Sequence, residues 1–189
     1  MKRYACMPRR RLERGPYAII AVQPEHIEPI RQWRNAQIDV LRQSAPLTRA
    51  QQEHYYASQI WPAMQQPQPA NLLVSYFLED RLIGYGGLVH IAWEHRRAEV
   101  SFLLDLSRAC DLDRADADFA EFLALMQELA FADLRFHRLS TETYAMRERH
   151  IAVLGAAGFR LEGVMRDHVF IQGRPMDSLI HGCLKSDVR

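Results

Sequence analysis

Residues 142–159 read ETYAMRERHIAVLGAAGF, and this stretch carries the strongest indication of the architecture. It begins inside a strand-like run, 138–144, and passes into a helix-like run, 146–157. The pair Gly158-Phe159 closes the helix, because glycine readily adopts the backbone conformation that ends helices. A new strand pattern begins at Arg160. The stretch therefore predicts a strand, a short helix and another strand in succession.

Patterns on both sides extend this unit. Downstream, two strand-like runs at 160–171 and 174–184 flank Gln172-Gly173 and predict a terminal hairpin. Upstream, residues 116–134 carry apolar side chains at three- and four-residue spacing. This spacing is typical of an amphipathic helix whose apolar stripe faces the core.

The N-terminal half adds strands and helices of the same kind. Strands are expected at 17–22, 71–78, 82–90 and 97–104, and helices at 24–35 and 48–64. A helix between the fourth and fifth strands implies a parallel connection within an otherwise antiparallel sheet. The predicted fold class is α/β (α+β): one domain with a mixed, mostly antiparallel seven-stranded sheet and helices on both faces.

Composition fits a single soluble domain. The chain has 189 residues, of which 48% are hydrophobic and 25% charged, and its net charge of +1 argues against a nucleic-acid-binding protein. No apolar run is long enough to span a membrane, and no signal peptide is recognised. The cysteines are three and widely spaced, which favours neither disulfides nor a zinc site. We expect a cytoplasmic protein that binds no metal.

The N-terminus is strongly basic. Within residues 1–14, one acidic residue, Glu13, stands against Lys2, Arg3, Arg9, Arg10, Arg11 and Arg14. We expect residues 1–16 to form a flexible, solvated arm, followed by the domain at 17–184 and a tail at 185–189. Contact of the arm with anionic lipid or nucleic acid is an alternative, and so is a true start at Met7.

The order of elements resembles the Gcn5-related N-acetyltransferase (GNAT) fold over about residues 17 to 184. Three local matches carry the resemblance: the helix ending in Ala130-Phe131, the helix ending in Gly158-Phe159, and the hairpin 170–177. Trp33-Arg34-Asn35 is similar to the subset that acetylates amino sugars on nucleotide carriers, or protein N-termini. The resemblance implies that the fourth and fifth strands splay apart and that acetyl-CoA is the co-substrate.

The resemblance also implies where the co-substrate binds. Its pantetheine arm would pair with the backbone of the fourth strand, at about Phe102, Leu103 and Leu104. Its pyrophosphate would lie at the start of the helix that follows, where free backbone N–H groups and the helix dipole favour anions. The glycine-bearing loop of the family is degenerate here, and depending on the register it starts at Arg108 or at Arg114. Asp116 and Asp118 would oppose the phosphates, and Arg147 could reach them instead.

Acetyl transfer requires a neutral amine, a polarised thioester and a stabilised leaving thiolate. Glu99 and His90 are the candidate general bases. The family's usual acid, a tyrosine, is replaced by Leu154, and its usual asparagine by Arg147. Tyr144 and His150 are the nearest candidate replacements.

On the acceptor side the resemblance implies Trp33, Arg34 and Asn35. The expected function is direct acetyl transfer in a ternary complex to a small primary amine, with a nucleotide-linked amino sugar favoured. The degenerate loop and Leu154 leave open a non-catalytic binding or regulatory module, and acetylation of protein N-termini is a further alternative. A homodimer through the terminal hairpin is also expected from the resemblance.

Overall fold

The computed structural model describes residues 1–41, 43 and 45–188. Its strands form one eight-stranded sheet in the order β1-β2-β3-β4-β5-β6-β8-β7. They are β1 (Arg11–Arg14), β2 (Tyr17–Ala21), β3 (Leu72–Leu78), β4 (Arg81–Ala92), β5 (Arg97–Leu104), β6 (Arg138–Tyr144), β7 (Arg160–Ile171) and β8 (Arg174–Leu184). All neighbouring strands run antiparallel except β5 and β6, which are parallel. The mixed, mostly antiparallel sheet is therefore confirmed, but the expected count of seven strands is wrong.

The extra strand is β1, from the basic N-terminus. Leu12 of β1 is only 1% exposed, and Tyr4 is fully buried with its hydroxyl accepting a hydrogen bond from the backbone N–H of Leu73 at 2.9 Å. Arg9 pairs with Glu128 at 2.7 Å and with Asp133 at 2.8 Å. These contacts hold residues 1–14 against the rest of the domain. In the sequence the basic charges of this segment have few acidic neighbours, but the fold brings carboxylate partners to them.

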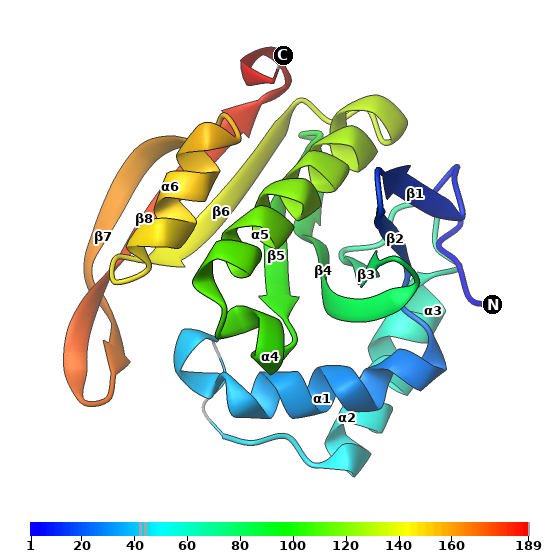
Figure 1. Ribbon diagram of the computed structural model, residues 1–189. Helices are drawn as coiled ribbons and strands as arrows, with labels where there is room; N and C mark the ends of the chain where they lie inside the picture. The colour runs from blue at the N-terminus through cyan, green and yellow to red at the C-terminus, as the bar shows by residue number, and fades with distance from the viewer. Residues whose placement is uncertain (42, 44, 189) are drawn as a thin grey trace.

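The helices occupy the segments between the strands (Figure 1). Before β3 lie η1 (Pro24–His26), α1 (Ile27–Ala36), η2 (Ile38–Val40), α2 (Arg49–Tyr55), the π-helical turn η3 (Tyr56–Ile60) and α3 (Trp61–Ala63). After β5 come α4 (Leu106–Ala109), α5 (Leu112–Gln127) with the π-helical turn η4 (Glu128–Asp133), α6 (Glu148–Ala156) and the C-terminal η5 (Lys185–Asp187).

Neighbouring residues of β4 show that helices cover both faces of the sheet. A Cβ built on Gly86 would lie 2.8 Å from the ring of Phe122, so this residue faces α5. The preceding residue, Tyr85, points to the opposite face, where its hydroxyl accepts a hydrogen bond from Arg34 of α1. On the α5 face, Phe102 stacks on Phe119 and tilts against Phe122, at centroid distances of 4.7 and 4.8 Å. This aromatic cluster fixes β5 against α5.

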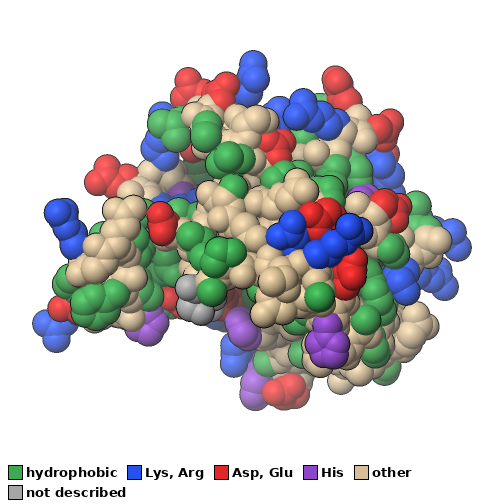
Figure 2. Space-filling view, turned by 90° about the horizontal axis from the view of Figure 1, so that it is seen from below, with side chains coloured by type: hydrophobic (Ala, Val, Ile, Leu, Met, Phe, Trp, Pro, Cys, Tyr) green, Lys and Arg blue, Asp and Glu red, His purple; other side chains and the backbone are tan. Residues whose placement is uncertain are grey.

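The surface carries mixed charge. In the view from below, basic and acidic side chains are interspersed rather than separated by sign (Figure 2). Pairs such as Arg31–Glu28 at 2.8 Å and Arg49–Glu53 at 2.9 Å account for this pattern on α1 and α2. Among the helices that the structure describes, none combines the length and apolar composition needed to cross a membrane.

Candidate active site

The parallel strands β5 and β6 stay together only at one end. Their pairing extends from Arg97–Arg138 to Glu99–Ser140 and then stops. Beyond it, β5 continues to Leu104 beside β4, whereas β6 continues to Tyr144 beside β8. The strands therefore diverge, as the resemblance predicts, and a parallel strand whose neighbour has left presents backbone groups to whatever fills the gap.

Two cavities open along this gap. The first, which we call the splay cavity, has a volume of about 330 Å³ and lies between β5 and β6. The second, which we call the helix cavity, has a volume of about 450 Å³ and lies between the end of β5, the start of α5 and the start of α6. Four described residues line both cavities and define the neck between them: Val40, Phe102, Arg147 and His150. Both volumes fall in the range of small-molecule sites.

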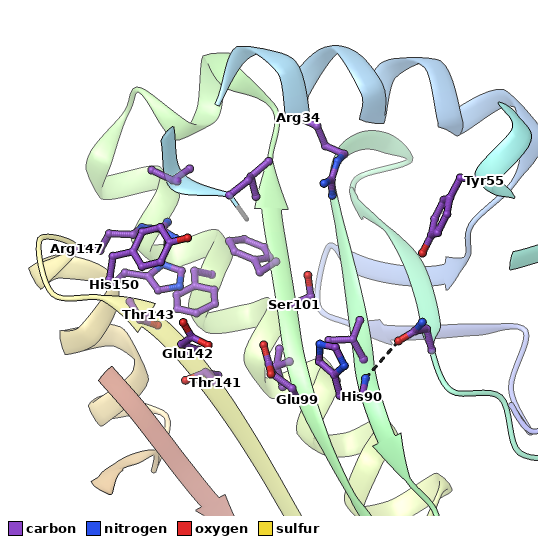
Figure 3. A pocket seen from close by; sticks show the side chains of 18 residues that line it. Arg34, Tyr55, His90, Glu99, Ser101, Thr141, Glu142, Thr143, Arg147 and His150 are labelled. Carbon is purple, nitrogen blue, oxygen red and sulfur yellow. Dashed lines mark hydrogen bonds between the residues drawn. The ribbon is translucent and has the colours of Figure 1, made fainter. Parts of the chain in front are cut away.

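Carboxylates from both diverging strands reach the splay cavity. Figure 3 shows Glu99 of β5 and Glu142 of β6 on its two sides, with His90 of β4 beside Glu99. His90 follows Val89, the residue of β4 that is in register with Glu99, and adopts a positive φ of 50°. Its backbone N–H is held by the Asn71 side chain at 3.2 Å. The two predicted bases thus lie on adjacent strands at the same cavity.

Arg147 and His150 form the polar part of the neck. A guanidinium nitrogen of Arg147 lies 3.3 Å from Nδ1 of His150, whose ring stacks on Phe119 at 3.7 Å. Because arginine can only donate, Nδ1 is the acceptor and the ring proton lies on Nε2. Burial lowers the pKa of His150 well below its usual value, and the charge of Arg147 adds to this effect. His150 is therefore neutral near pH 7. Its Nε2–H can donate a hydrogen bond, but the neutral ring does not serve as the general acid.

The other candidate acid, Tyr144, lines the splay cavity at the end of β6 and is 8% exposed. Thr141, on the same strand, has a buried hydroxyl without a hydrogen-bond partner among the described residues. Thr141 also lines the splay cavity, although its hydroxyl oxygen is itself buried. This residue escapes sequence reasoning because threonine is ordinary in strands.

The predicted co-substrate residues divide into two groups. Phe102, Leu103 and Leu104 line the helix cavity, as does Arg147. Arg108 and Arg114 do not line it. Arg108 turns to the buried Asp118, with a hydrogen bond of 2.8 Å, and Arg114 is exposed and pairs with Asp111 at 3.2 Å.

The two acidic residues expected to oppose phosphates are both neutralised. Asp118 is fully buried and faces Arg108 and the Tyr17 hydroxyl, not the cavity. Asp116 lines the helix cavity but pairs with Arg149 at 2.6 Å. The repulsion between these two carboxylates and the phosphates of the co-substrate, which the sequence leads us to expect, is therefore weaker in the folded protein.

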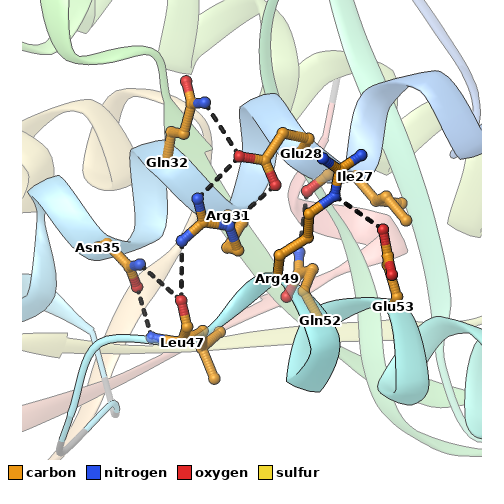
Figure 4. A network of polar contacts seen from close by, with 9 residues as sticks. All are labelled: Ile27, Glu28, Arg31, Gln32, Asn35, Leu47, Arg49, Gln52 and Glu53. Carbon is orange, nitrogen blue, oxygen red and sulfur yellow. Dashed lines mark hydrogen bonds and ion pairs between the residues drawn. The ribbon is translucent and has the colours of Figure 1, made fainter.

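Of the three predicted acceptor residues, only Arg34 reaches the splay cavity. Its guanidinium is positioned by the Tyr85 hydroxyl at 2.5 Å and by Gln43 at 3.0 Å. Trp33 is partly buried against the core. Asn35 instead holds the loop before α2, accepting from the Leu47 N–H at 2.8 Å and donating to its carbonyl at 2.9 Å (Figure 4).

Several cavity residues lie outside the sequence-based set: Tyr55, Asn71, Ser101, Thr141, Glu142 and Thr143. Glu142 could have been predicted from the sequence, because the parallel pairing of β5 with β6 places it near Glu99. The described residues contain no group of three or more histidine, cysteine or acidic side chains that could hold a metal ion.

Comparisons with known proteins agree with this geometry. A family model described as an acetyltransferase (GNAT) domain matches residues 19–180. A search of curated proteins finds no match. Among solved structures, the spermidine N-acetyltransferase from Vibrio cholerae in complex with CoA and spermine is similar, with a TM-score of 0.78 and 18% identity over 92% of this chain and 98% of that one.

Two further structures are similar. A dodecameric spermidine N-acetyltransferase from Vibrio cholerae, in an intermediate state, gives a TM-score of 0.77 at 18% identity and covers 92% of this chain and 96% of that one. A putative acetyltransferase gives 0.68 at 18% identity, with 95% and 88% covered. At such identities the similarity establishes a shared fold.

Proposed function

The chain belongs to the GNAT acetyltransferase family, and we propose that it moves an acetyl group from acetyl-CoA to the primary amine of a small molecule. It is an N-acetyltransferase by family, and the predicted resemblance is confirmed. The non-catalytic module suggested by Leu154 and the degenerate loop is accordingly not favoured.

The observation that carries the proposal is the pair of adjacent cavities that share the neck residues. Two adjacent cavities let two substrates meet without a covalent enzyme intermediate. Holding both in line supplies a large share of the rate enhancement. Acetyl-CoA would enter by the helix cavity, along Phe102, Leu103 and Leu104, and the amine would enter by the splay cavity. Transfer would then be direct, in a ternary complex.

The residues of the splay cavity suit an amine that is cationic in solution. Glu99 and Glu142 supply negative charge from opposite sides of the cavity. An ammonium ion must lose a proton before its nitrogen can attack a carbonyl carbon, and Glu99 or His90 would accept that proton. Thr141 and Tyr144 would orient the acceptor or the acetyl oxygen through their hydroxyl groups.

The co-substrate's pyrophosphate would lie near the N-terminus of α5, where backbone N–H groups favour anions. Arg114 remains the predicted arginine at this end. Arg108, in contrast, has its guanidinium committed to Asp118. We therefore propose Arg114, rather than Arg108, as the cationic partner of the pyrophosphate.

The acceptor class is proposed more broadly than the sequence suggests. A nucleotide-linked amino sugar gains no support from the similar structures, two of which are spermidine N-acetyltransferases. We propose a small aliphatic amine, with a polyamine as the first compound to test. Arg34 at the edge of the cavity would in turn suit an acceptor that also carries an anionic group. A cytoplasmic location and a homodimer through the β7–β8 hairpin stay predictions.

The test begins with calorimetric binding of acetyl-CoA, with CoA for comparison. Binding in the micromolar range is expected, and no binding at millimolar concentration would refute the proposal. An acceptor panel of polyamines, amino sugars and N-terminal peptides, read by mass spectrometry, then identifies the substrate class. Glu99→Gln and His90→Ala, tested singly and together on that substrate, assign the base. Full turnover by both single variants and by the double variant would exclude both residues.

A further inference from the structure

The neck between the two cavities carries one permanent positive charge among the described residues that define it, the guanidinium of Arg147. Val40 and Phe102 are apolar, and His150 is neutral near pH 7 because burial lowers its pKa. If the proposed function holds, the acetyl group is transferred where the two cavities meet. Negative charge that develops on the co-substrate during transfer would then develop beside Arg147.

The Arg147 side chain is held in place by His150. It belongs to the residue that immediately precedes α6, and its guanidinium donates to Nδ1 of His150 at 3.3 Å. The ring of His150 is in turn fixed by nearly parallel stacking on Phe119, with 3.7 Å between centroids and 12° between planes. Figure 3 shows Arg147, just before α6, and His150 of α6 lying side by side at the gap. A pre-positioned cation costs no reorganisation when charge appears.

We propose that the Arg147 guanidinium stabilises the thiolate of CoA as it leaves. The reaction then needs no proton donor at the position where Leu154 replaces the family's usual tyrosine. This inference rests on the proposed function. The bond that forms joins the acceptor nitrogen to the acetyl carbon, and the bond that breaks is the C–S bond. The electron pair stays on sulfur beside Arg147, and the proton lost from nitrogen passes through Glu99 or His90 to solvent. His150 is a positioning residue for Arg147.

The surrounding charges leave Arg147 available for this role. Among the described residues, the contact of its guanidinium is to His150, and the nearby carboxylates of Asp113 and Asp116 pair with Arg149 instead. Asp116 of α5 is paired with Arg149, and Glu148 of α6 is exposed. From the strands, Glu99 and Glu142 face the splay cavity, and His181 of β8 lies close enough to lower the pKa of His150. Burial also lowers the pKa of Arg147, which marks its charge as incompletely solvated.

The experiment measures the thiol of bound CoA directly. The thiolate absorbs in the ultraviolet, and the spectrum of the protein with desulfo-CoA removes the contribution of the protein's own cysteines. An ordinary thiol titrates near pH 8.5 or above, and a cation within about 4–6 Å lowers a pKa by about one to three units. In the wild-type complex we expect a shift of that size relative to free CoA. Arg147→Lys should keep most of it, and Arg147→Gln should lose it.

Arg160→Gln serves as the matched control, because Arg160 is exposed and pairs with Asp187 away from both cavities. It should leave the thiol titration unchanged. An equal titration of CoA bound to the wild type and to Arg147→Gln would overturn the inference. Failure of the wild type to bind CoA at all would instead overturn the proposed function.

A second measurement covers the case in which Arg147→Gln no longer binds CoA. Between the thiol pKa of bound CoA and the thiol pKa of free CoA, the affinity of the wild type for CoA should rise by about tenfold per pH unit, because of proton linkage. The affinity for desulfo-CoA should stay flat over the same range. Identical pH dependence for the two ligands would refute a stabilised thiolate, whatever the behaviour of the variant.

Discussion

Replacing Asp118 with alanine should destabilise the protein more than any exposed charge substitution. Asp118 is fully buried in α5. Its carboxylate accepts two hydrogen bonds from Arg108, one of them at 2.8 Å, and a third from the Tyr17 hydroxyl at 3.0 Å. The Arg108 side chain is 14% exposed, so water cannot replace the lost carboxylate well. The substitution would leave a nearly buried cation and a hydroxyl without their acceptor.

The magnitude follows from the cost of removing one partner of a buried pair, about 3–5 kcal/mol in unfolding free energy. For a chain of this size, 1 kcal/mol corresponds to about 2–4 °C in Tm. The expected loss is therefore about 6–20 °C, and it should be visible in both thermal and urea unfolding. An exposed pair such as Arg14–Glu121 should contribute less than about 1 kcal/mol and serves as the comparison.

A double-mutant cycle separates the pair from simple loss of packing. Arg108→Met removes the cation and leaves the buried carboxylate, so it should also be costly. Arg108→Met combined with Asp118→Ala removes both charges, and the double variant should be more stable than the sum of the single losses predicts, by about 2 kcal/mol or more. Additive losses, or a loss below about 1 kcal/mol for Asp118→Ala alone, would refute the reasoning.

Three further substitutions test other parts of the structure. Gly86→Ala should cost at least about 2 kcal/mol, because its Cβ would collide with the carbonyl oxygen of Ser101; unchanged urea unfolding would contradict this. Tyr4→Phe should cost about 1–3 kcal/mol, since it removes the acceptor of the buried Leu73 N–H; an unchanged Tm would count against that bond. His150→Phe should weaken the acid sensitivity of folding. The folded-state pKa of His150 is lowered, so the unfolded chain binds more protons below about pH 6.5 and stability falls as pH drops. The Tm difference between pH 7 and pH 5 should therefore be smaller in the variant, and an equal difference would show that His150 does not titrate this way.

The succession of strands and helices was predictable because it rests on repeated spacing of apolar residues. The amphipathic stripe of α5 and the glycine after α6 can each be recognised in the local sequence. Once β5 is predicted, the positions of its residues in the sheet, such as Phe102, are predicted with it. The strand β1 leaves almost none, because Leu12 is its only apolar residue. Its neighbourhood is stabilised by distant partners, such as Arg9 with Asp133, which no local pattern reveals.

The candidate site was predictable to the extent that backbone position defines it. Glu99 and Arg147 line cavities because their places in β5 and before α6 put them there. Arg108 could not be placed, because its role depends on which way a long side chain turns, and Asp118, a full ten residues away, attracts it. Asn35 is similar: its sequence context suggests ligand binding, but the loop at Leu47 uses both atoms of its amide.

The two outer strands of the sheet have a consequence for aggregation. A sheet with open edges can recruit further chains through its unpaired backbone groups. At one edge, β1 is only four residues long, and three of them carry charge. At the other edge, β7 is long but irregular, with register shifts at Leu161/Gly163 and Met165/Val169. Such bulges bend a strand and disturb the regular row of groups that another chain would need. Both edges therefore resist fibril-like stacking, although β7 exposes apolar side chains such as Phe170, which is 74% exposed.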